Sequence, residues 1–479
     1  MKSLNTDVAI IGAGTAGLSA YRAVKAAGLE AILIEGGPYG TTCARVGCMP
    51  SKLLIAAAEA AHAAATAGLF GVHIDGKLRI DGKQVMDRVR RERDRFVGFV
   101  LDSVEGIPAA DKLRGHARFL SDTVLQVDDH TEITAGRVII ATGSTPAVPE
   151  MYQILEDRVV VNDDVFDWQD LPGSVMVAGA GVIGLELGQA LARLGVKTRI
   201  VNRSGGVGGV TDPEVRASAV AAFQSELDLC LNATIESVRR KGEQVEVGYR
   251  LQDGSEHMAT VDYLLAAVGR RPNVHALDLH NTSAVLDDKG MPEYDPATLQ
   301  LGVSPIFIAG DVNGVLPLLH EAADDGQIAG ESAAAYPHAR PGVRRAPMAI
   351  VFSDPQLAQA GIRFKDLPSQ GVAIGEVDFA NQGRSRVMLK NRGKLRVYAR
   401  VRDGRFLGAE MAGPAMEHIA HLLAWSVQKE LTVAEMLKMP FYHPVVEEGL
   451  RTALRDCAKK LVAAELEHVC EGDQAVNNA

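Results

Sequence analysis

Two cysteines, Cys43 and Cys48, are separated by four residues in the segment GTTCARVGCMPSK, which covers residues 40–52. A pair at this spacing can close a small disulfide ring and open it again. Pro50 and the alanine-rich run after it predict a helix that begins here, because proline is tolerated in the first turn of a helix. Cys48 would then lie at a helix N-terminus, where the helix dipole favours thiolate over thiol. Because thiol–disulfide exchange requires a thiol of low pKa, we predict a redox-active pair.

The remaining cysteines, Cys230, Cys457 and Cys470, show no such spacing. An odd and sparse count in 479 residues argues against a secreted disulfide scaffold. Zinc would need four ligands, and no second Cys/His cluster is spaced to supply them, so no metal site is predicted. Two inert buried cysteines are the alternative to a redox pair. Cys230 and Cys457 lie in apolar contexts typical of a protein core, and Cys470 lies in the C-terminal tail.

A histidine close to two acids is found near the C-terminus, in the segment FYHPVVEE at residues 441–448. Pro444 predicts the start of the last long helix, which leaves His443 just outside it. A carboxylate one turn along could fix the tautomer of the imidazole and raise its basicity. A histidine before a helix usually has no chemical role, but a redox pair elsewhere in the chain makes His443 a candidate proton carrier.

An internal repeat joins residues 8–37 to residues 175–204 at a constant offset. Each copy reads as an apolar strand, a G-x-G-x-x-G turn, a helix and a second strand. The glycines are Gly12, Gly14 and Gly17 in the first copy and Gly179, Gly181 and Gly184 in the second. The first glycine permits a tight turn, the second lets the backbone approach a pyrophosphate, and the third allows close helix–strand packing. Two matched copies predict two dinucleotide sites, with each pyrophosphate at a helix N-terminus.

The residue that closes the second strand differs between the two copies. Glu35 can accept hydrogen bonds from ribose hydroxyls. Its counterpart Asn202 is uncharged and is followed by Arg203, which could pair with a 2′-phosphate. This difference favours NADP(H) over NAD(H) at the second site. In the alternative, Asn202 bonds the ribose through its amide and Arg203 is merely exposed to solvent.

Two other strand-like runs end in turns suited to binding. Residues 138–144 end with Thr142 and Gly143, and residues 306–311 end with Asp311. A carboxylate at the carboxyl end of a parallel strand is well placed for a ligand hydroxyl, although a plain helix N-cap is the alternative. Proline and arginine concentrate at residues 337–345 and predict a linker. Beyond it, strand-like stretches precede helical patterns at residues 415–429 and 445–467.

The composition limits the classes of protein to consider. A chain of 479 residues is too long for one core, and its 47% hydrophobic and 23% charged residues are ordinary for a soluble protein. The net charge of −10, without a long basic run, argues against nucleic acid as a partner. We expect no stretch of the chain to be apolar over the ~20 residues that a membrane span needs, and no signal-peptide pattern is seen. We therefore expect no membrane partner and a cytoplasmic location.

These motifs resemble the pyridine-nucleotide disulfide oxidoreductases, specifically the dihydrolipoamide dehydrogenase and glutathione reductase group. The segment GTTCARVGCMPSK is similar to the family's GGTCxNxGCxPSK, and ATGS, GRRPN, AGD and HPVVEE follow in the family's order. The resemblance implies an α/β fold with two Rossmann-like dinucleotide-binding domains and a C-terminal α+β dimerisation domain. The implied domains are an FAD-binding domain at 1–149 and 273–345, an NAD(P)-binding domain at 150–272 and the dimerisation domain at 346–479.

The resemblance also implies roles for individual side chains. Cys43 would be the interchange thiol, and Cys48 the charge-transfer thiol near the flavin. Lys52 would pair with Glu186 beside the flavin's reactive nitrogen. His443, oriented by Glu448, would serve the redox pair of the partner subunit, so a homodimer is expected. The implied cofactor-binding residues are Gly12, Gly14, Gly17, Glu35, Thr42, Lys52, Thr142, Gly143 and Asp311 for FAD, with Asp311 on the ribityl chain, and Gly179, Gly181, Gly184, Asn202, Arg203 and Gly269 for NAD(P).

Several positions depart from the family pattern. Thr41 replaces a glycine, and Phe441 stands where lipoamide dehydrogenases often have a second histidine. Arg203 resembles the NADPH-using reductases, and Arg22 resembles an arginine with which glutathione reductases hold a substrate carboxylate. Mercuric reductase is disfavoured because no adjacent pair of cysteines stands at the C-terminus.

The sequence therefore predicts an FAD-dependent dithiol/disulfide oxidoreductase similar to dihydrolipoamide dehydrogenase. The predicted substrate is a small dithiol or disulfide, with the lipoyl group of a multienzyme complex as one candidate. The first alternative is an NADPH-dependent disulfide reductase similar to glutathione reductase. The second is a non-catalytic nucleotide-binding subunit of a multienzyme complex.

Overall fold

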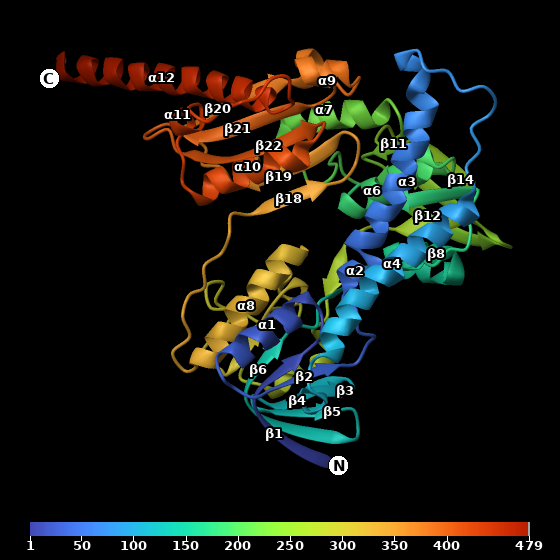
Figure 1. The fold of residues 1–479 in the computed structure, drawn as a ribbon, viewed down its shortest axis with the longest axis vertical. Helices are drawn as coiled ribbons and strands as arrows, with labels where there is room; N and C mark the ends of the chain where they lie inside the picture. The colour runs from blue at the N-terminus through green and yellow to red at the C-terminus, as the bar shows by residue number, and fades with distance from the viewer. Residues whose placement is uncertain (478–479) are drawn as a thin grey trace.

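The computed structural model describes the backbone of residues 1–477 and the side chains up to residue 464. Cys470 therefore lies outside the described side chains. Three units, each built on its own sheet, make up the molecule (Figure 1). The mixed α/β architecture agrees with the fold class expected from the sequence.

The first unit contains a seven-stranded sheet in which β1 pairs in parallel with both β2 and β6, and β17 returns from far along the chain to pair with β6. Val8, Ala9 and Ile10 of β1 are fully buried, because helices cover the parallel strands. Helices α1 and α8 pack against each other. The elements are β1 (Lys2–Ile11), α1 (Thr15–Ala26), β2 (Ala31–Glu35), α2 (Thr42–Val46), α3 (Cys48–Thr66), α4 (Gly82–Glu105), β3 (Lys112–Arg114), β4 (Ala117–Ser121), β5 (Val124–Val127), β6 (Thr131–Ile140), β17 (Ile306–Ile308) and α8 (Leu319–Ala335).

The second unit repeats this arrangement, since β9 pairs in parallel with both β10 and β15. A three-stranded antiparallel sheet, β12–β13–β14, is added to it, and the short pair β7 and β16 lies where the two units join. The elements are β7 (Ser144–Pro146), β8 (Val159–Val160), α5 (Asn162–Val165), β9 (Ser174–Ala178), α6 (Val182–Arg193), β10 (Lys197–Asn202), α7 (Pro213–Gln224), β11 (Asp228–Leu231), β12 (Thr234–Lys241), β13 (Gln244–Arg250), β14 (Glu256–Val261), β15 (Tyr263–Ala266) and β16 (Arg270–Pro272).

The C-terminal unit is a five-stranded antiparallel sheet in the order β18–β19–β22–β21–β20, with helices packed on it. An irregular segment at residues 338–347, which overlaps the linker expected at 337–345, connects α8 to β18 (Figure 1). The elements are β18 (Met348–Val351), β19 (Gln356–Gly361), β20 (Val372–Asp378), α9 (Gly383–Val387), β21 (Lys394–Arg400), β22 (Phe406–Gly413), α10 (Met416–Gln428), α11 (Val433–Met436) and α12 (Glu448–Asn477).

Two expectations from the sequence were wrong in detail. The last helix begins at Glu448 rather than at Pro444. A turn precedes it, in which the Glu448 carboxylate accepts the backbone N–H of Val445 at 3.4 Å. In addition, the helical stretch Thr42–Phe70 is long and apolar enough for a membrane span by length and composition, with a mean hydropathy of 1.5. Its many alanines explain that value, and α3 packs against α4 and α6. One such helix is weak evidence for a membrane, and the absence of a membrane partner stays a prediction.

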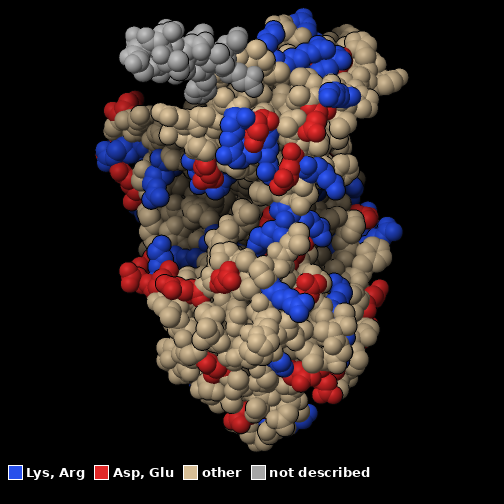
Figure 2. All heavy atoms as spheres, turned by 90° about the vertical axis from the view of Figure 1, so that its left-hand side faces the viewer, with Lys and Arg blue, Asp and Glu red and all other residues tan. Residues whose placement is uncertain are grey.

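The molecule is hollowed on the face that Figure 2 presents, between its lower and upper parts, and charged side chains of both signs stand around the hollow. The sheet of the first unit lies in the lower part of the molecule and that of the C-terminal unit in its upper part (Figure 1).

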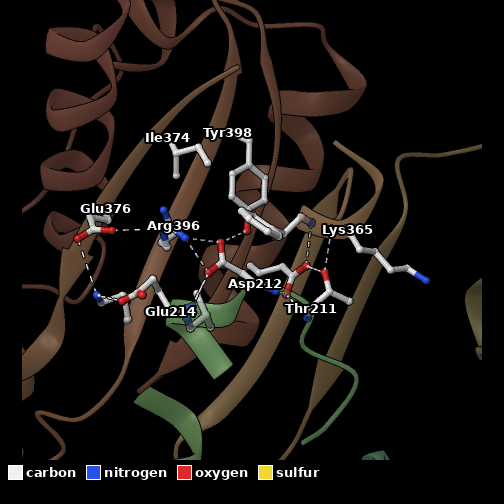
Figure 3. A network of polar contacts seen from close by, with 12 residues as sticks. Thr211, Asp212, Glu214, Lys365, Ile374, Glu376, Arg396 and Tyr398 are labelled. Carbon is white, nitrogen blue, oxygen red and sulfur yellow. Dashed lines mark hydrogen bonds and ion pairs between the residues drawn. The ribbon is translucent and has the colours of Figure 1, made fainter. Parts of the chain in front are cut away.

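A buried polar network fastens the second unit to the C-terminal unit (Figure 3). Asp212, which is fully buried, caps α7 and accepts hydrogen bonds from Arg396 at 2.9 and 3.0 Å and from the Tyr398 hydroxyl at 2.9 Å. Glu410, also fully buried, accepts the backbone N–H groups of Thr211 at 2.6 Å and Asp212 at 2.9 Å. Because the two carboxylates receive donors from both units, the network holds the units in one relative position.

Replacing Asp212 with alanine is expected to lower the free energy of unfolding by about 3–5 kcal/mol, because it leaves the Arg396 charge without its buried partner. Chemical denaturation of the full-length holoenzyme measures this change. Asp403→Ala is the matched control, since Asp403 pairs with Arg400 at 2.6 Å on the surface and should change stability little. Equal stability of the two variants would contradict the role of the network.

Candidate active site

The two glycine turns have the geometry that a bound pyrophosphate requires. A Cβ at Gly12 would lie 2.3 Å from the carbonyl oxygen of Ala141, and one at Gly17 would lie 1.8 Å from that of Gly12. A Cβ at Gly14 would meet nothing within 4 Å. The first and third glycines are therefore needed for close packing, whereas the second faces open space at the N-terminus of α1.

The second turn repeats these contacts almost atom for atom. A Cβ at Gly179 would lie 2.4 Å from the Ala267 carbonyl oxygen, and one at Gly184 would lie 2.0 Å from that of Gly179. Gly181, at the N-terminus of α6, again faces open space. The residues of both turns therefore fit a dinucleotide.

The residues that close the second strands support these turns in two different ways. Oε2 of Glu35 accepts the N–H of Ala13 at 2.7 Å, and Oδ1 of Asn202 accepts the N–H of Ala180 at 3.2 Å. The Asn202 amide nitrogen donates to the carbonyl oxygens of Ser204 at 2.8 Å and Gly206 at 2.9 Å. Asn202 thus holds its turn without placing a negative charge there, and the adjacent Arg203 is exposed.

A cavity of about 460 Å³ brings the redox pair together with residues of both turns. The residues expected in the site from the sequence that line it are Gly14, Thr42, Cys43, Cys48, Lys52, Gly143, Glu186 and Asp311. A second cavity of about 1290 Å³ is lined by Gly179, Gly181, Asn202, Arg203 and Gly269, and again by Asp311. Asp311 therefore lies between the two, and its Oδ2 accepts a hydrogen bond from the Ser144 hydroxyl at 3.0 Å.

Other expected residues line neither cavity. Gly12, Gly17 and Gly184 instead pack the turns, and the Glu35 carboxylate accepts the backbone N–H groups of Ala13 and Gly37. The Thr142 hydroxyl donates to the Asn273 carbonyl oxygen at 2.7 Å.

Cys48 is the first residue of α3, and Pro50 lies in the first turn. A hydrogen bond from the Cys43 thiol and the positive charge of Lys52 together lower the pKa of Cys48 to about 7, although burial opposes them. The same hydrogen bond, together with burial, raises the pKa of Cys43. These shifts favour the thiolate at Cys48 over Cys43, and the division of roles between the two thiols stays a prediction.

Lys52 and Glu186 form a partly buried ion pair in the wall of the cavity. The Lys52 amine donates to the two carboxylate oxygens at 2.9 and 2.7 Å, and Glu186 is 4% exposed. Glu186 also accepts the N–H of Phe352 at 2.9 Å, and the Lys52 amine lies 4.6 Å from the centre of the Phe352 ring. Residues from all three units therefore fix the position of this charge pair.

His443 lies apart from the cavity within its own chain. Its Nδ1 is 3.0 Å from Oε2 of Glu448, which leaves Nε2 free to accept or donate a proton. The imidazole is 81% exposed, and the other Glu448 oxygen accepts from Arg451 at 3.0 Å. The histidine–carboxylate pair thus exists, but a single chain does not bring it to Cys43 and Cys48.

Two family models match the chain. Residues 6–326 match the model of the family described as pyridine nucleotide-disulphide oxidoreductase. Residues 348–454 match its dimerisation domain. The chain belongs to this family. It is therefore an FAD-dependent disulfide oxidoreductase, and the C-terminal match supports a homodimer.

Relatives within the family carry several different names. Dihydrolipoyl dehydrogenase of Haloferax volcanii is 29% identical over 94% of this chain and 95% of its own length. Mercuric reductase of Shigella flexneri is 29% identical over 93% of this chain and 80% of its own length. The HOCl-induced flavoprotein disulfide reductase RclA from Escherichia coli has the same fold, with a TM-score of 0.78, 24% identity and coverage of 94% of this chain and 99% of its own. These relatives therefore share a fold but carry names that state different activities.

One departure from the family pattern has a structural consequence. Thr41, which replaces a glycine, has a φ of 57° and a ψ of 149°, a conformation that glycine adopts far more readily. Its hydroxyl accepts the N–H of Ala44 at 3.4 Å and so caps α2 in front of Cys43. Arg22 lies exposed on α1.

Several residues that line the two cavities were not predicted from the sequence. Asn162, Phe352, His320 and His421 all line the redox cavity. None belongs to a motif with recognisable spacing, and each comes from a segment that only the fold brings to Cys48. Arg270, which stands in the quoted GRRPN motif without an assigned role, lines both cavities.

Proposed function

We propose that this enzyme catalyses dithiol + NADP⁺ ⇌ disulfide + NADPH + H⁺, in the manner of a dihydrolipoamide dehydrogenase that uses NADP(H). The single observation that supports this most strongly is the convergence of Cys43, the Cys48 thiolate and the Lys52–Glu186 pair on one cavity between two dinucleotide turns. FAD would supply two-electron transfer between the nicotinamide and the disulfide. Cys43 would exchange with the substrate, and Cys48 would receive and release electrons on the flavin side.

The preference for NADP(H) rests on Asn202 and Arg203. Asn202 carries no negative charge, so this position does not repel a 2′-phosphate. Its amide instead bonds the backbone of the turn. Arg203 is exposed in the wall of the larger cavity and makes no ion pair among the residues that the structure describes. A guanidinium binds a phosphate through charge-assisted hydrogen bonds, so this position suits the extra phosphate.

His443 is proposed to act on the redox pair of the partner subunit. Its exposure and its separation from the cavity of its own chain support this arrangement. Glu448 would hold Nδ1 so that Nε2 exchanges protons with the dithiol. The sparse cysteines and the reducing chemistry suit a cytoplasmic location, which we also propose.

A second candidate within the family is an NADPH-dependent reductase of a small disulfide, favoured by Arg203 and by the exposed Arg22. A steady-state panel that crosses NADH and NADPH with lipoamide and glutathione disulfide separates the two candidates. Faster turnover of lipoamide supports the first, and faster turnover of glutathione disulfide supports the second.

The proposed cofactor preference predicts a higher kcat/KM for NADPH than for NADH. Arg203→Ala should lower kcat/KM for NADPH about 10–100-fold, because a charge-assisted hydrogen bond to the phosphate is lost. The kcat/KM of the same variant for NADH is the internal control and should hardly change. Equal or better use of NADH by the unmodified enzyme would overturn the preference.

A further inference from the structure

We propose that Asn162 is a positioning residue that holds the turn between the two redox cysteines. Asn162 is 5% exposed, and its Nδ2 donates a 2.8 Å hydrogen bond to the backbone carbonyl oxygen of Val46. The same Nδ2 donates to Oδ1 of Asp163 at 2.9 Å. Both amide protons are thus engaged, which fixes the direction of the amide. This inference rests on the assignment of Cys43 and Cys48 as the redox pair.

The Val46 carbonyl, which accepts this hydrogen bond, belongs to the turn directly before Cys48. Val46 is the last residue of α2, and only Gly47 separates it from Cys48, the first residue of α3. A Cβ at Gly47 would lie 3.1 Å from the Thr42 carbonyl oxygen and 3.2 Å from the Cys43 Cα. The turn is therefore packed against the backbone that carries Cys43, and a displacement of the Val46 carbonyl would move Cys48 relative to Cys43.

The contact also joins two units of the molecule. Asn162 opens α5, in the segment that leads into the second unit, 116 residues along the chain from Val46. It lines both the redox cavity and the cavity of the second glycine turn. One amide therefore connects the redox turn to the side from which the nicotinamide cofactor would approach.

The two sulfur atoms move apart when the disulfide is reduced and together when it forms. Because the hydrogen bond holds the Val46 carbonyl, we expect this movement to occur in the cysteine side chains and not in the backbone of the turn. The donor also offsets the negative end of the Val46 carbonyl dipole, which lies two residues before Cys48 in the chain. Loss of the bond should therefore both loosen the pair and disfavour the thiolate.

The test compares Asn162→Ala and Asn162→Leu in the full-length FAD-loaded enzyme. Leucine has nearly the same shape as asparagine, carries no charge and cannot donate to Val46, so it carries the test if the alanine variant fails to fold. The measurement is the pH dependence of the thiolate-to-flavin charge-transfer absorbance after two-electron reduction. Its midpoint should rise by about half to one pH unit in both variants. Dithiol turnover should fall, while electron transfer from NADPH to an artificial dye that bypasses the cysteines should persist.

Asn281→Ala is the matched control. The Asn281 amide also donates to a backbone carbonyl, that of Phe119 at 2.9 Å, far along the chain from the redox turn. This variant should keep the midpoint of the unmodified enzyme. Unchanged midpoints and unchanged dithiol turnover in the Asn162 variants would overturn the inference alone. Absence of the absorbance band in the unmodified enzyme would instead overturn the assignment of the redox pair.

Discussion

Replacing His443 with glutamine is expected to slow dithiol oxidation by about 10²–10⁴-fold, because glutamine can hydrogen-bond but cannot carry a proton. The Glu448 carboxylate that orients the imidazole at 3.0 Å stays in place in this variant. Stopped-flow measurement of flavin reduction by dithiol, compared with flavin reduction by NADPH, locates the defect. The NADPH half of the reaction should keep its rate, since the proposed proton transfer by His443 belongs to the exchange between the dithiol and the redox pair. A near-normal rate of dithiol oxidation would remove His443 from the mechanism.

Mixed dimers test whether His443 acts across the dimer. A subunit with Cys43→Ser and a subunit with His443→Gln should each form an inactive homodimer. If the histidine serves the partner's cysteines, the mixed dimer contains one intact site, formed by the normal Cys43 of one chain and the normal His443 of the other. Co-expression with two affinity tags isolates that dimer. Activity in the mixed dimer supports the arrangement, and its absence would show that each chain uses its own histidine.

Replacing either redox cysteine with serine is expected to lower dithiol turnover by about 10³-fold or more, since neither cysteine can form the disulfide alone. The two variants should nevertheless differ in their spectra. Cys43→Ser leaves Cys48 as an unpaired thiolate beside the flavin, and the serine hydroxyl can still donate the hydrogen bond that the Cys43 thiol gave. Its oxidised form should therefore show charge-transfer absorbance above about pH 7, whereas Cys48→Ser should show none.

Cys230→Ser is the control for these variants, because Cys230 is half-buried on β11 and lines neither cavity. It should retain the turnover and spectrum of the unmodified enzyme. Equal spectra in the Cys43→Ser and Cys48→Ser variants would contradict the division of labour between the two thiols.

Features that depend on short-range spacing were predictable from the sequence. The glycine turns at Gly12 and Gly179 require only a strand, a turn and a helix in succession, and the structure confirms each element. The start of α3 followed from Pro50, two residues after Cys48. The start of α12 was wrong, because a proline can stand in a turn before a helix as well as inside its first turn.

Features that join distant segments were not predictable from local patterns. Lys52 and Glu186 are 134 residues apart, and only the family resemblance paired them. Asn162 and Phe352 reach the redox cavity through the packing of three units, and no periodicity or motif marks them. The contacts of Asp212 with Arg396 and Tyr398 were not predictable either, since each residue alone is typical of a helix cap or a strand.

The central claim is that Cys43 and Cys48 form a redox pair whose thiolate, Cys48, lies against the flavin. Anaerobic addition of two electrons per FAD, followed by absorbance spectra between pH 5 and pH 9, tests it most directly. Because the pKa of Cys48 is lowered to about 7, a long-wavelength charge-transfer band should grow as the pH rises through that value. The flavin itself should stay oxidised while the cysteines hold the electrons. A flavin that bleaches fully with the first two electrons and shows no such band at any pH would contradict the account.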